Sequence, residues 1–183
     1  MVERGLHGVG YVVSDEHVGL VAALRRYFPE ALHQRCEVHF QRNALSKVSS
    51  EALQDRTRIG LRDVWDAPSR PEADGRLRRL IAELQLDAPG LAEWLADTAA
   101  AILACYALSR DDVRRNLRST NAVERHHEEV RRRTRVIRIF PDEASLQRLL
   151  TALAMEQNDH WRSQRWLVAP TFLPEERPMR RTA

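Results

Sequence analysis

VGYVVSD, residues 9–15, decides the fold class of this chain, because it is a short apolar run with β-branched side chains that ends in an acid. Such a run, bounded by small residues, predicts a buried strand. A helical pattern follows and ends at Pro29, since proline cannot donate the next hydrogen bond. A second short strand is expected at residues 32–35, before a helix over residues 36–48. Strand, helix and strand in this order predict a parallel pair with a crossover.

Beyond this unit the strand signals disappear. Amphipathic patterns with proline and glycine between them predict an all-helical insertion. Two more helices are expected, one over residues 121–133 and a longer one from Pro141, whose apolar face between Leu146 and Trp161 should be core or dock on the sheet. The fold class is therefore mainly α with a partial α/β core. The expected divisions are a strand–helix–strand–helix unit at 1–48, the helical insertion at 49–108, C-terminal helices at 109–168, and a basic, proline-containing tail at 169–183.

Length and composition limit the class of protein. A chain of 183 residues with a formal net charge of +3 can bury one core and is too short for two full domains. Its two cysteines, Cys36 and Cys105, are too few for a disulfide framework and fit a reducing compartment. No apolar run is long enough to cross a bilayer. The sequence therefore predicts a cytoplasmic protein with no membrane partner.

Arginine is concentrated in one segment. Residues 110–138 hold ten Arg and five acids, a local charge of +5. Such an excess favours contact with a DNA backbone. Two alternatives stay open: a solvated helix face paired with Glu128 and Glu129, and codon bias, because Lys47 is the only lysine. The candidate DNA-binding residues are Arg118, Arg125, Arg131, Arg132, Arg133, Arg135 and Arg138.

Two acids occupy positions suited to metal chemistry. Asp15 follows the first strand, and Glu124 lies at the head of a helix framed by Arg. Carboxylate oxygens are the ligands that hard Mg²⁺ takes in proteins. Both acids also have a structural interpretation: Ser14 and Asp15 are common helix N-cap residues, and Asn121 with Glu124 has the spacing of a capping box.

Four motifs in chain order carry a resemblance. They are VSDEHVGL at residues 13–20, QRCEVHFQRN at 34–43, STNAVER at 119–125 and RRRTRVIRIFP at 131–141, with Glu156-Gln157-Asn158 and Trp161 beyond them. Together they resemble the Mutator-like transposases of bacterial insertion sequences. The resemblance implies an RNase H-like fold, here incomplete, with an all-helical insertion at 49–108.

The same resemblance implies roles for individual residues. Family members use an Asp-Asp-Glu triad with Mg²⁺ or Mn²⁺ to cut and join DNA, so Asp15 is expected to be the second Asp and Glu124 the Glu, both as catalytic metal ligands. Cys36 and His39 match the family's Cys-x-x-His pair near the active site, and Asn121 is expected to support the acids with them. Zinc binding by this pair with His126 and His127 is disfavoured, because the spacing is less regular than zinc sites prefer.

The chain departs from the family pattern at its beginning. The family's first Asp lies upstream of any residue here, so we expect a C-terminal fragment that is inactive alone. Relatives commonly have Arg-Leu-Asn where this chain has Arg125-His126-His127, so the contacts made there are an open question. The expected partners are the terminal inverted repeats of the element, target DNA and other transposase chains, in the nucleoid of a bacterial cytoplasm. Two alternatives are a non-catalytic helical DNA-binding or regulatory remnant that interferes with a full-length transposase, and a chain without activity.

Overall fold

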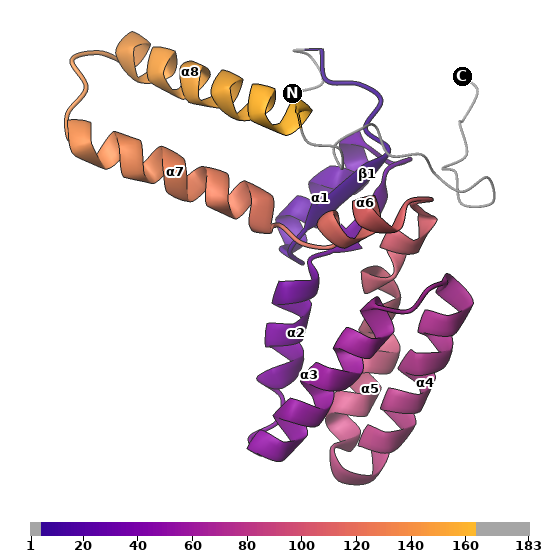
Figure 1. The fold of residues 1–183 in the computed structure, drawn as a ribbon. Helices are drawn as coiled ribbons and strands as arrows, with labels where there is room; N and C mark the ends of the chain where they lie inside the picture. Colours follow the sequence, from indigo (N-terminus) through magenta and orange to yellow (C-terminus); the bar gives the residue numbers. More distant parts are fainter. Residues whose placement is uncertain (1–4, 164–183) are drawn as a thin grey trace.

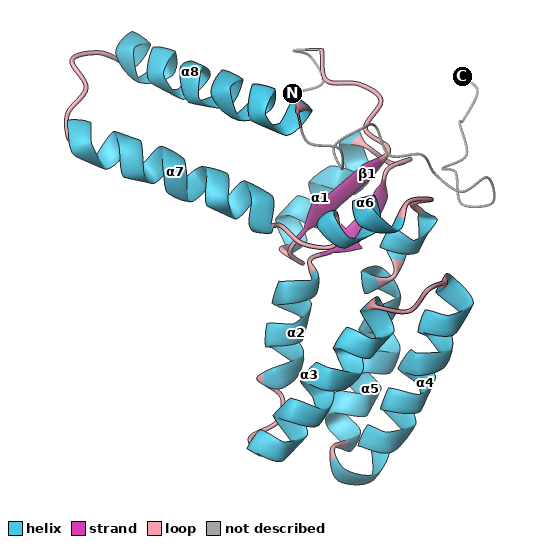
Figure 2. Ribbon diagram, in the orientation of Figure 1, coloured by secondary structure: helices cyan, strands magenta, loops and turns pink. Residues whose placement is uncertain are grey.

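A small parallel sheet stands at the centre of the protein, whose residues 5–163 are described by a computed structural model (Figure 1). β1 (Tyr11–Ser14) and β2 (Leu32–Arg35) pair in parallel, with Ser14 opposite Arg35. α1 (Val18–Tyr27) forms the crossover between them. The predicted strand–helix–strand unit is therefore confirmed, and helices make up most of the rest (Figure 2). The assignment of this unit to an RNase H-like core stays a prediction.

A helical body follows the sheet and contains most of the buried residues. Ser69 is the N-cap of α4 (Arg70–Asp87), and its hydroxyl accepts a hydrogen bond from the backbone N–H of Glu72 at 3.4 Å. Pro89 begins α5 (Pro89–Thr98), a position where its missing N–H costs no intrahelical hydrogen bond. The elements of the body are α2 (Glu37–Leu45), α3 (Glu51–Trp65), α4 (Arg70–Asp87), α5 (Pro89–Thr98) and two 3₁₀ helices, η2 (Ala99–Ile102) and η3 (Ala104–Ala107).

Leucine side chains fill the core of the helical body. Leu61, Leu84 and Leu95 come from α3, α4 and α5, and each is fully buried. Gly60 lets α3 and α4 approach closely, since a Cβ atom there would lie 2.4 Å from the Cδ1 atom of Leu80. The helices expected over 49–108 thus pack as one unit with α2.

Gln34 joins the sheet to the helical body. Its side chain is fully buried and donates from Nε2 to the carbonyl oxygen of Ile102 at 2.9 Å. Its Oε1 atom accepts a hydrogen bond from the backbone N–H of Cys105 at 2.8 Å. Because one side chain bonds both 3₁₀ segments, β2 and the end of the body are held together. The position of the strand ends is therefore fixed relative to the body.

The last two long helices form a hairpin that projects from the rest of the molecule (Figure 1). α6 (Asp111–Asn116) leads to α7 (Asn121–Ile137), and α8 (Glu143–Arg162) returns beside it. We call residues 121–162 the arm. α7 buries no side chain, and α8 buries only Leu153. The prediction that the face between Leu146 and Trp161 is core or docks on the sheet was wrong for most of that face, because Leu146, Leu149 and Trp161 are only half-buried beside α7 and Leu150 is exposed.

Several helix boundaries differ from the expected ones. The helix predicted over 36–48 spans Glu37–Leu45, and the one predicted over 121–133 continues to Ile137. α8 starts after Pro141, because the Asp142 carboxylate accepts the backbone N–H of Ser145 at 2.6 Å and caps the helix. The predicted tail at 169–183 lies outside the described residues. Within residues 5–163, no helix combines the length and apolar character needed to span a membrane.

Candidate functional site

The carboxyl ends of the two strands meet the base of the arm. Ser14 ends β1, and its carbonyl oxygen accepts the backbone N–H of Cys36, the residue after β2, at 2.8 Å. Cys36 Sγ in turn accepts the backbone N–H of Thr120 at 3.4 Å and lies 3.3 Å from the hydroxyl oxygen of Thr120. Asp15 follows Ser14 directly. The two predicted acids therefore approach one edge of the sheet, the edge where ligands of α/β sheets bind.

Glu124 is positioned by side chains from two elements. The Thr120 hydroxyl donates to Oε1 of Glu124 at 2.6 Å. His39 of α2 places Nε2 3.9 Å from the same oxygen. The Glu124 side chain is half exposed, and Oε2 accepts no hydrogen bond from the residues that the structure describes. One oxygen is thus fixed by the protein while the other stays open to a ligand.

The capping interpretations of both acids were wrong. The N-cap of α1 is His17, two residues beyond Asp15. Asp15 is exposed, and within residues 5–163 its carboxylate makes no hydrogen bond or ion pair. Asn121 is the first residue of α7 and Thr120 is its N-cap, without a side-chain cap bond. The Glu124 carboxylate bonds the Thr120 hydroxyl rather than a backbone N–H.

Thr120 is the residue that the sequence reasoning missed. Asn121, which was expected to support the acids, is exposed and makes no hydrogen bond with the part of the chain that the structure describes. Thr120 instead contacts both Cys36 and Glu124. Its position four residues before Glu124 was a usable signal, since side chains at i and i+4 share a helix face.

The donor set suits part of a site for a hard metal ion. Asp15 and Glu124 supply carboxylate oxygens, and no Arg or Lys pairs with either acid in the described residues. Across residues 5–163, however, no group of three or more His, Cys, Asp and Glu residues lies close enough to hold a metal. The set Cys36, His39, His126 and His127 forms no such group there. His126 lies instead beside Trp161, with ring centroids 6.1 Å apart.

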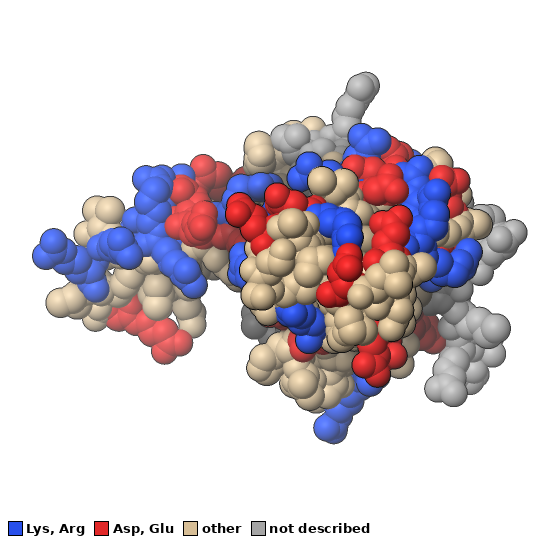
Figure 3. Space-filling model, turned by 90° about the horizontal axis from the view of Figure 1, so that it is seen from below, with Lys and Arg blue, Asp and Glu red and all other residues tan. Residues whose placement is uncertain are grey.

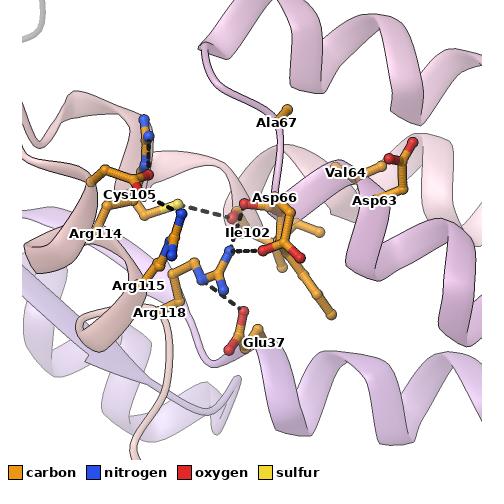
Figure 4. A network of polar contacts seen from close by, with 12 residues as sticks. Glu37, Asp63, Val64, Asp66, Ala67, Ile102, Cys105, Arg114, Arg115 and Arg118 are labelled. Atoms are coloured by element: carbon orange, nitrogen blue, oxygen red, sulfur yellow. Dashed lines mark hydrogen bonds and ion pairs between the residues drawn. The ribbon is translucent and has the colours of Figure 1, made fainter.

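Arg118 joins the base of the arm to the helical body (Figure 4). Its guanidinium is paired with Glu37 at 3.1 Å and with Asp66 at 3.3 Å, and it donates to the Trp65 carbonyl at 2.5 Å. Burial raises the pKa of the Glu37 carboxyl, and the Arg118 charge offsets part of that rise. Only 12% of the Arg118 side chain is exposed. Because its charge is used internally, this geometry does not support the prediction that Arg118 binds DNA.

Replacing Arg118 with Met should destabilise the fold. Glu37 would keep a buried charge without its partner, a change that costs about 3 kcal/mol in comparable pairs. Urea unfolding at neutral pH measures this loss. The control is Arg125→Met, because Arg125 is exposed on α7 and has no ion pair in the described chain. We expect the control to change stability by less than about 0.5 kcal/mol.

The destabilisation of Arg118→Met should also depend on pH. The folded pKa of Glu37 is raised, so its unfavourable charge is lost as the pH falls toward 4.5, the ordinary pKa of glutamate. The difference between the variant and the wild type should therefore shrink at that pH. An equal loss at both pH values would contradict the role given to Glu37.

The other candidate arginines are exposed on the arm (Figure 3). Arg132 and Arg133 both pair with Glu129 at 2.7 Å, and their hydrogen bonds lower the pKa of Glu129 to about 2. The solvated, paired alternative is thus confirmed for these two with Glu129, while Glu128 has no such pair in the described chain. Of the candidate arginines, four have no acidic partner within residues 5–163: Arg125, Arg131, Arg135 and Arg138.

Acids at a strand edge beside a basic arm are the combination expected of a protein that acts on nucleic-acid backbones. Comparison with known families identifies the particular family. Residues 1–164 match the family described as "Transposase, Mutator family". The chain therefore belongs to the Mutator family of transposases, as its motifs predicted.

Individual relatives agree with this assignment. The chain is 43% identical over 162 residues to the transposase for insertion sequence element ISRM5 of Rhizobium meliloti (strain 1021). The aligned segment covers 86% of this chain and 39% of that protein. It is 36% identical to the transposase for IS406 of Burkholderia multivorans, over 88% of this chain and 41% of the relative. It is 35% identical to the transposase for IS256 in transposon Tn4001 of Staphylococcus aureus, over 87% and 40%. The chain thus spans about two fifths of the length of these relatives.

Proposed function

We propose that this chain is the C-terminal part of a metal-dependent transposase that cuts and joins DNA at the ends of an insertion element. The proposal is carried by one series of contacts, from Ser14 to Cys36, to Thr120 and to Glu124. This series brings the start of α7, with Glu124, to the end of β1, where Asp15 lies. The match to transposases over residues 1–164 supports the same reading. The parallel strand pair is then part of an RNase H-like core, and α3 to α5 belong to its helical insertion.

Each residue at the strand edge has a distinct role in this proposal. Asp15 and Glu124 would hold Mg²⁺ or Mn²⁺ as the second and third acids of an Asp-Asp-Glu triad. The ion, when bound, activates water or a 3′ hydroxyl and stabilises the leaving oxygen. The Thr120 hydroxyl fixes the Glu124 carboxylate at 2.6 Å, and His39 approaches the same oxygen. Cys36 holds Thr120 in turn, so it acts on Glu124 through one intermediate.

The proposal includes inactivity of this chain alone. Two acids give a pair of metal ions too little negative charge, and in residues 5–163 no further His, Cys, Asp or Glu completes a group of three with them. The match covers only 39% of the ISRM5 transposase, so the remaining acid of the triad can lie in the part of that relative outside the match. Strand transfer should therefore require sequence that precedes the matched segment.

DNA and a second transposase chain are the proposed partners. Arg125, Arg131, Arg135 and Arg138 are exposed without acidic partners in the described residues and would contact phosphates of the terminal repeats and target. Self-association with other transposase chains in the bacterial nucleoid is part of the same proposal. The exposed apolar side chains of α8, Leu150 and Met155, support it, because such residues are found at interaction sites.

A chimera tests the function. The part of the ISRM5 transposase that precedes the matched segment would be joined to this chain, and excision of an element with ISRM5 ends would be measured in cells. We expect excision by the chimera in the presence of Mg²⁺ or Mn²⁺ and none by this chain alone. The intact relative serves as the positive control. A chimera that folds by circular dichroism but excises nothing would contradict the proposal, as would excision by this chain alone.

A second candidate function is a DNA-binding regulator without catalysis. Four arginines without acidic partners in the described chain, on α7 and at its end, favour this function. These arginines can bind phosphate without a metal ion. Metal binding separates the two functions. Asp15→Asn and Glu124→Gln should weaken Mn²⁺ binding by this chain, measured by electron paramagnetic resonance, if it is a transposase part. Unchanged Mn²⁺ binding in both variants would favour the regulator.

A further inference from the structure

The tip of the arm exposes apolar side chains. We define the tip as residues 136–140, the last two residues of α7 and the start of the loop to α8. Val136 is 80% exposed and Ile139 is 83% exposed, and Ile137 also faces solvent. Large apolar side chains so exposed at the end of a projecting hairpin stabilise nothing within the described chain. They therefore suggest contact with another molecule.

The backbone of the tip is strained at Arg138. Arg138 has φ 59° and ψ −56°, a conformation that side chains other than glycine rarely adopt. The backbone N–H of Ile139 donates to the carbonyl of Ile137 at 2.7 Å, which closes a γ-turn around Arg138. A turn of three residues places Ile137 and Ile139 on either side of Arg138. The chain therefore turns tightly at Arg138, between two exposed isoleucines.

Positive charge lies beside the tip, along one side of α7 and its end. Arg131, Arg135 and Arg138 line an open hollow of about 560 Å³ together with Thr134 and Phe140. None of the three arginines has an acidic partner within residues 5–163. The carboxylate of Asp142 is close in sequence, but it caps α8 through Ser145. The basic groups at the outer end of the arm are visible in Figure 3.

We propose that the tip is a DNA wedge: Ile139 and Val136 insert between adjacent base pairs while Arg131, Arg135 and Arg138 contact the flanking phosphates. This inference rests on the proposed function and adds to it a mode of DNA contact. Apolar side chains that unstack a base step bend the duplex and bring more phosphates within reach of the protein. Flexible pyrimidine–purine steps such as TA yield most easily, so they are the expected targets.

Charge and position favour DNA over other occupants. A protein partner with an apolar groove would not need three unpaired arginines beside it, whereas a polyanion with stacked apolar bases matches both features. The tip also stands at the opposite end of α7 from Glu124. A duplex gripped at the tip therefore lies along the same helix that carries the proposed catalytic acid. An anionic membrane or a second copy of this chain becomes an outcome of the test.

The test separates DNA binding from unstacking. The full 183-residue chain would be titrated onto a mixed-sequence duplex that carries 2-aminopurine at TA steps, with anisotropy of an end label reporting binding and 2-aminopurine fluorescence reporting unstacking. The wedge variant is Val136→Ser with Ile139→Ser. Its matched control is Ile59→Ser with Leu86→Ser, two exposed apolar residues of the helical body. The phosphate variant is Arg131→Gln with Arg135→Gln.

We expect the wild type to raise 2-aminopurine fluorescence on binding and the wedge variant to bind but lose that rise. The control should keep both signals. The phosphate variant should bind more weakly and lower the slope of log affinity against log salt by about two. Binding by the wild type without a fluorescence rise, or a rise that survives in the wedge variant, overturns the wedge and leaves the proposed function intact. Failure to bind DNA, including a preference for anionic vesicles, overturns both.

The free chain gives one further control. Sedimentation of the wild type and the wedge variant should give the same mass in the absence of DNA. A dimer that the two serine substitutions dissociate, with fluorescence on DNA unchanged, would assign the tip to contact between copies and overturn the wedge.

Discussion

We expect Glu124→Gln to abolish excision by the chimera with the ISRM5 transposase, and Glu128→Gln to leave excision near the level of the unmodified chimera. The amide keeps the size of the side chain and its oxygen still accepts the Thr120 hydroxyl bond, so the start of α7 should keep its structure. What is lost is the negative charge that a hard metal ion requires. Electrostatic groups that stabilise a transition state change rates by on the order of a thousandfold when removed.

Glu128 is a matched control because it lies on the same helix, is exposed and has no ion pair within the described chain. Excision frequency is read as colonies that regain a disrupted marker. The abundance of each chimera is checked by immunoblot. Comparable excision by the Glu124→Gln chimera would remove Glu124 from the triad, and equal losses in both variants would indicate a defect of α7 rather than of metal chemistry.

Leu84→Ala should lower the free energy of unfolding by roughly 2–5 kcal/mol, because truncation of a buried leucine removes apolar contacts and leaves a cavity. Leu84 is fully buried in the core between α3, α4 and α5. The stability of a domain of this size is on the order of 5–15 kcal/mol, so the loss is a large share of the total. The midpoint of urea unfolding, followed by far-ultraviolet circular dichroism, measures it.

Leu86→Ala provides the control in the same helix. Leu86 is 86% exposed, so the substitution removes the same atoms with little change in buried area. Its effect should be smaller than about 0.5 kcal/mol. Equal losses for Leu84 and Leu86 would mean that α4 does not pack as described here.

Much of the fold followed from local patterns in the sequence. The apolar β-branched run before Asp15 and the short run at β2 were bounded by turn residues, so both strands and their parallel pairing were predicted. Amphipathic patterns likewise predicted the helical segment over 49–108 that contains α3, α4 and α5. These features depend on neighbours in the sequence, and one chain suffices to read them.

Features that depend on tertiary contacts were missed. Arg118 looked like a DNA ligand because it stands among other arginines, and only the fold places it between Glu37 and Asp66. Asn121 looked like a cap, yet Thr120 takes that position and also bonds Glu124. The face of α8 has the spacing of a core helix, but only Leu153 on it is buried, because α7 alone among the described elements packs beside α8. Periodicity shows that a face is apolar and cannot show what it contacts.

The contact of Arg118 with α2 gives the molecule a mechanical division. The backbone N–H of Glu37 donates to the carbonyl of Arg118 at 2.9 Å, so the chain is anchored up to that residue, and α7 begins three residues later. From Glu124 to Ile137 the helix is a rod of about 20 Å. A rod fixed near one end acts as a lever. If DNA is held at the outer end as proposed, a force on that DNA is carried along α7 to the turn that holds Glu124 and can change the position of its carboxylate.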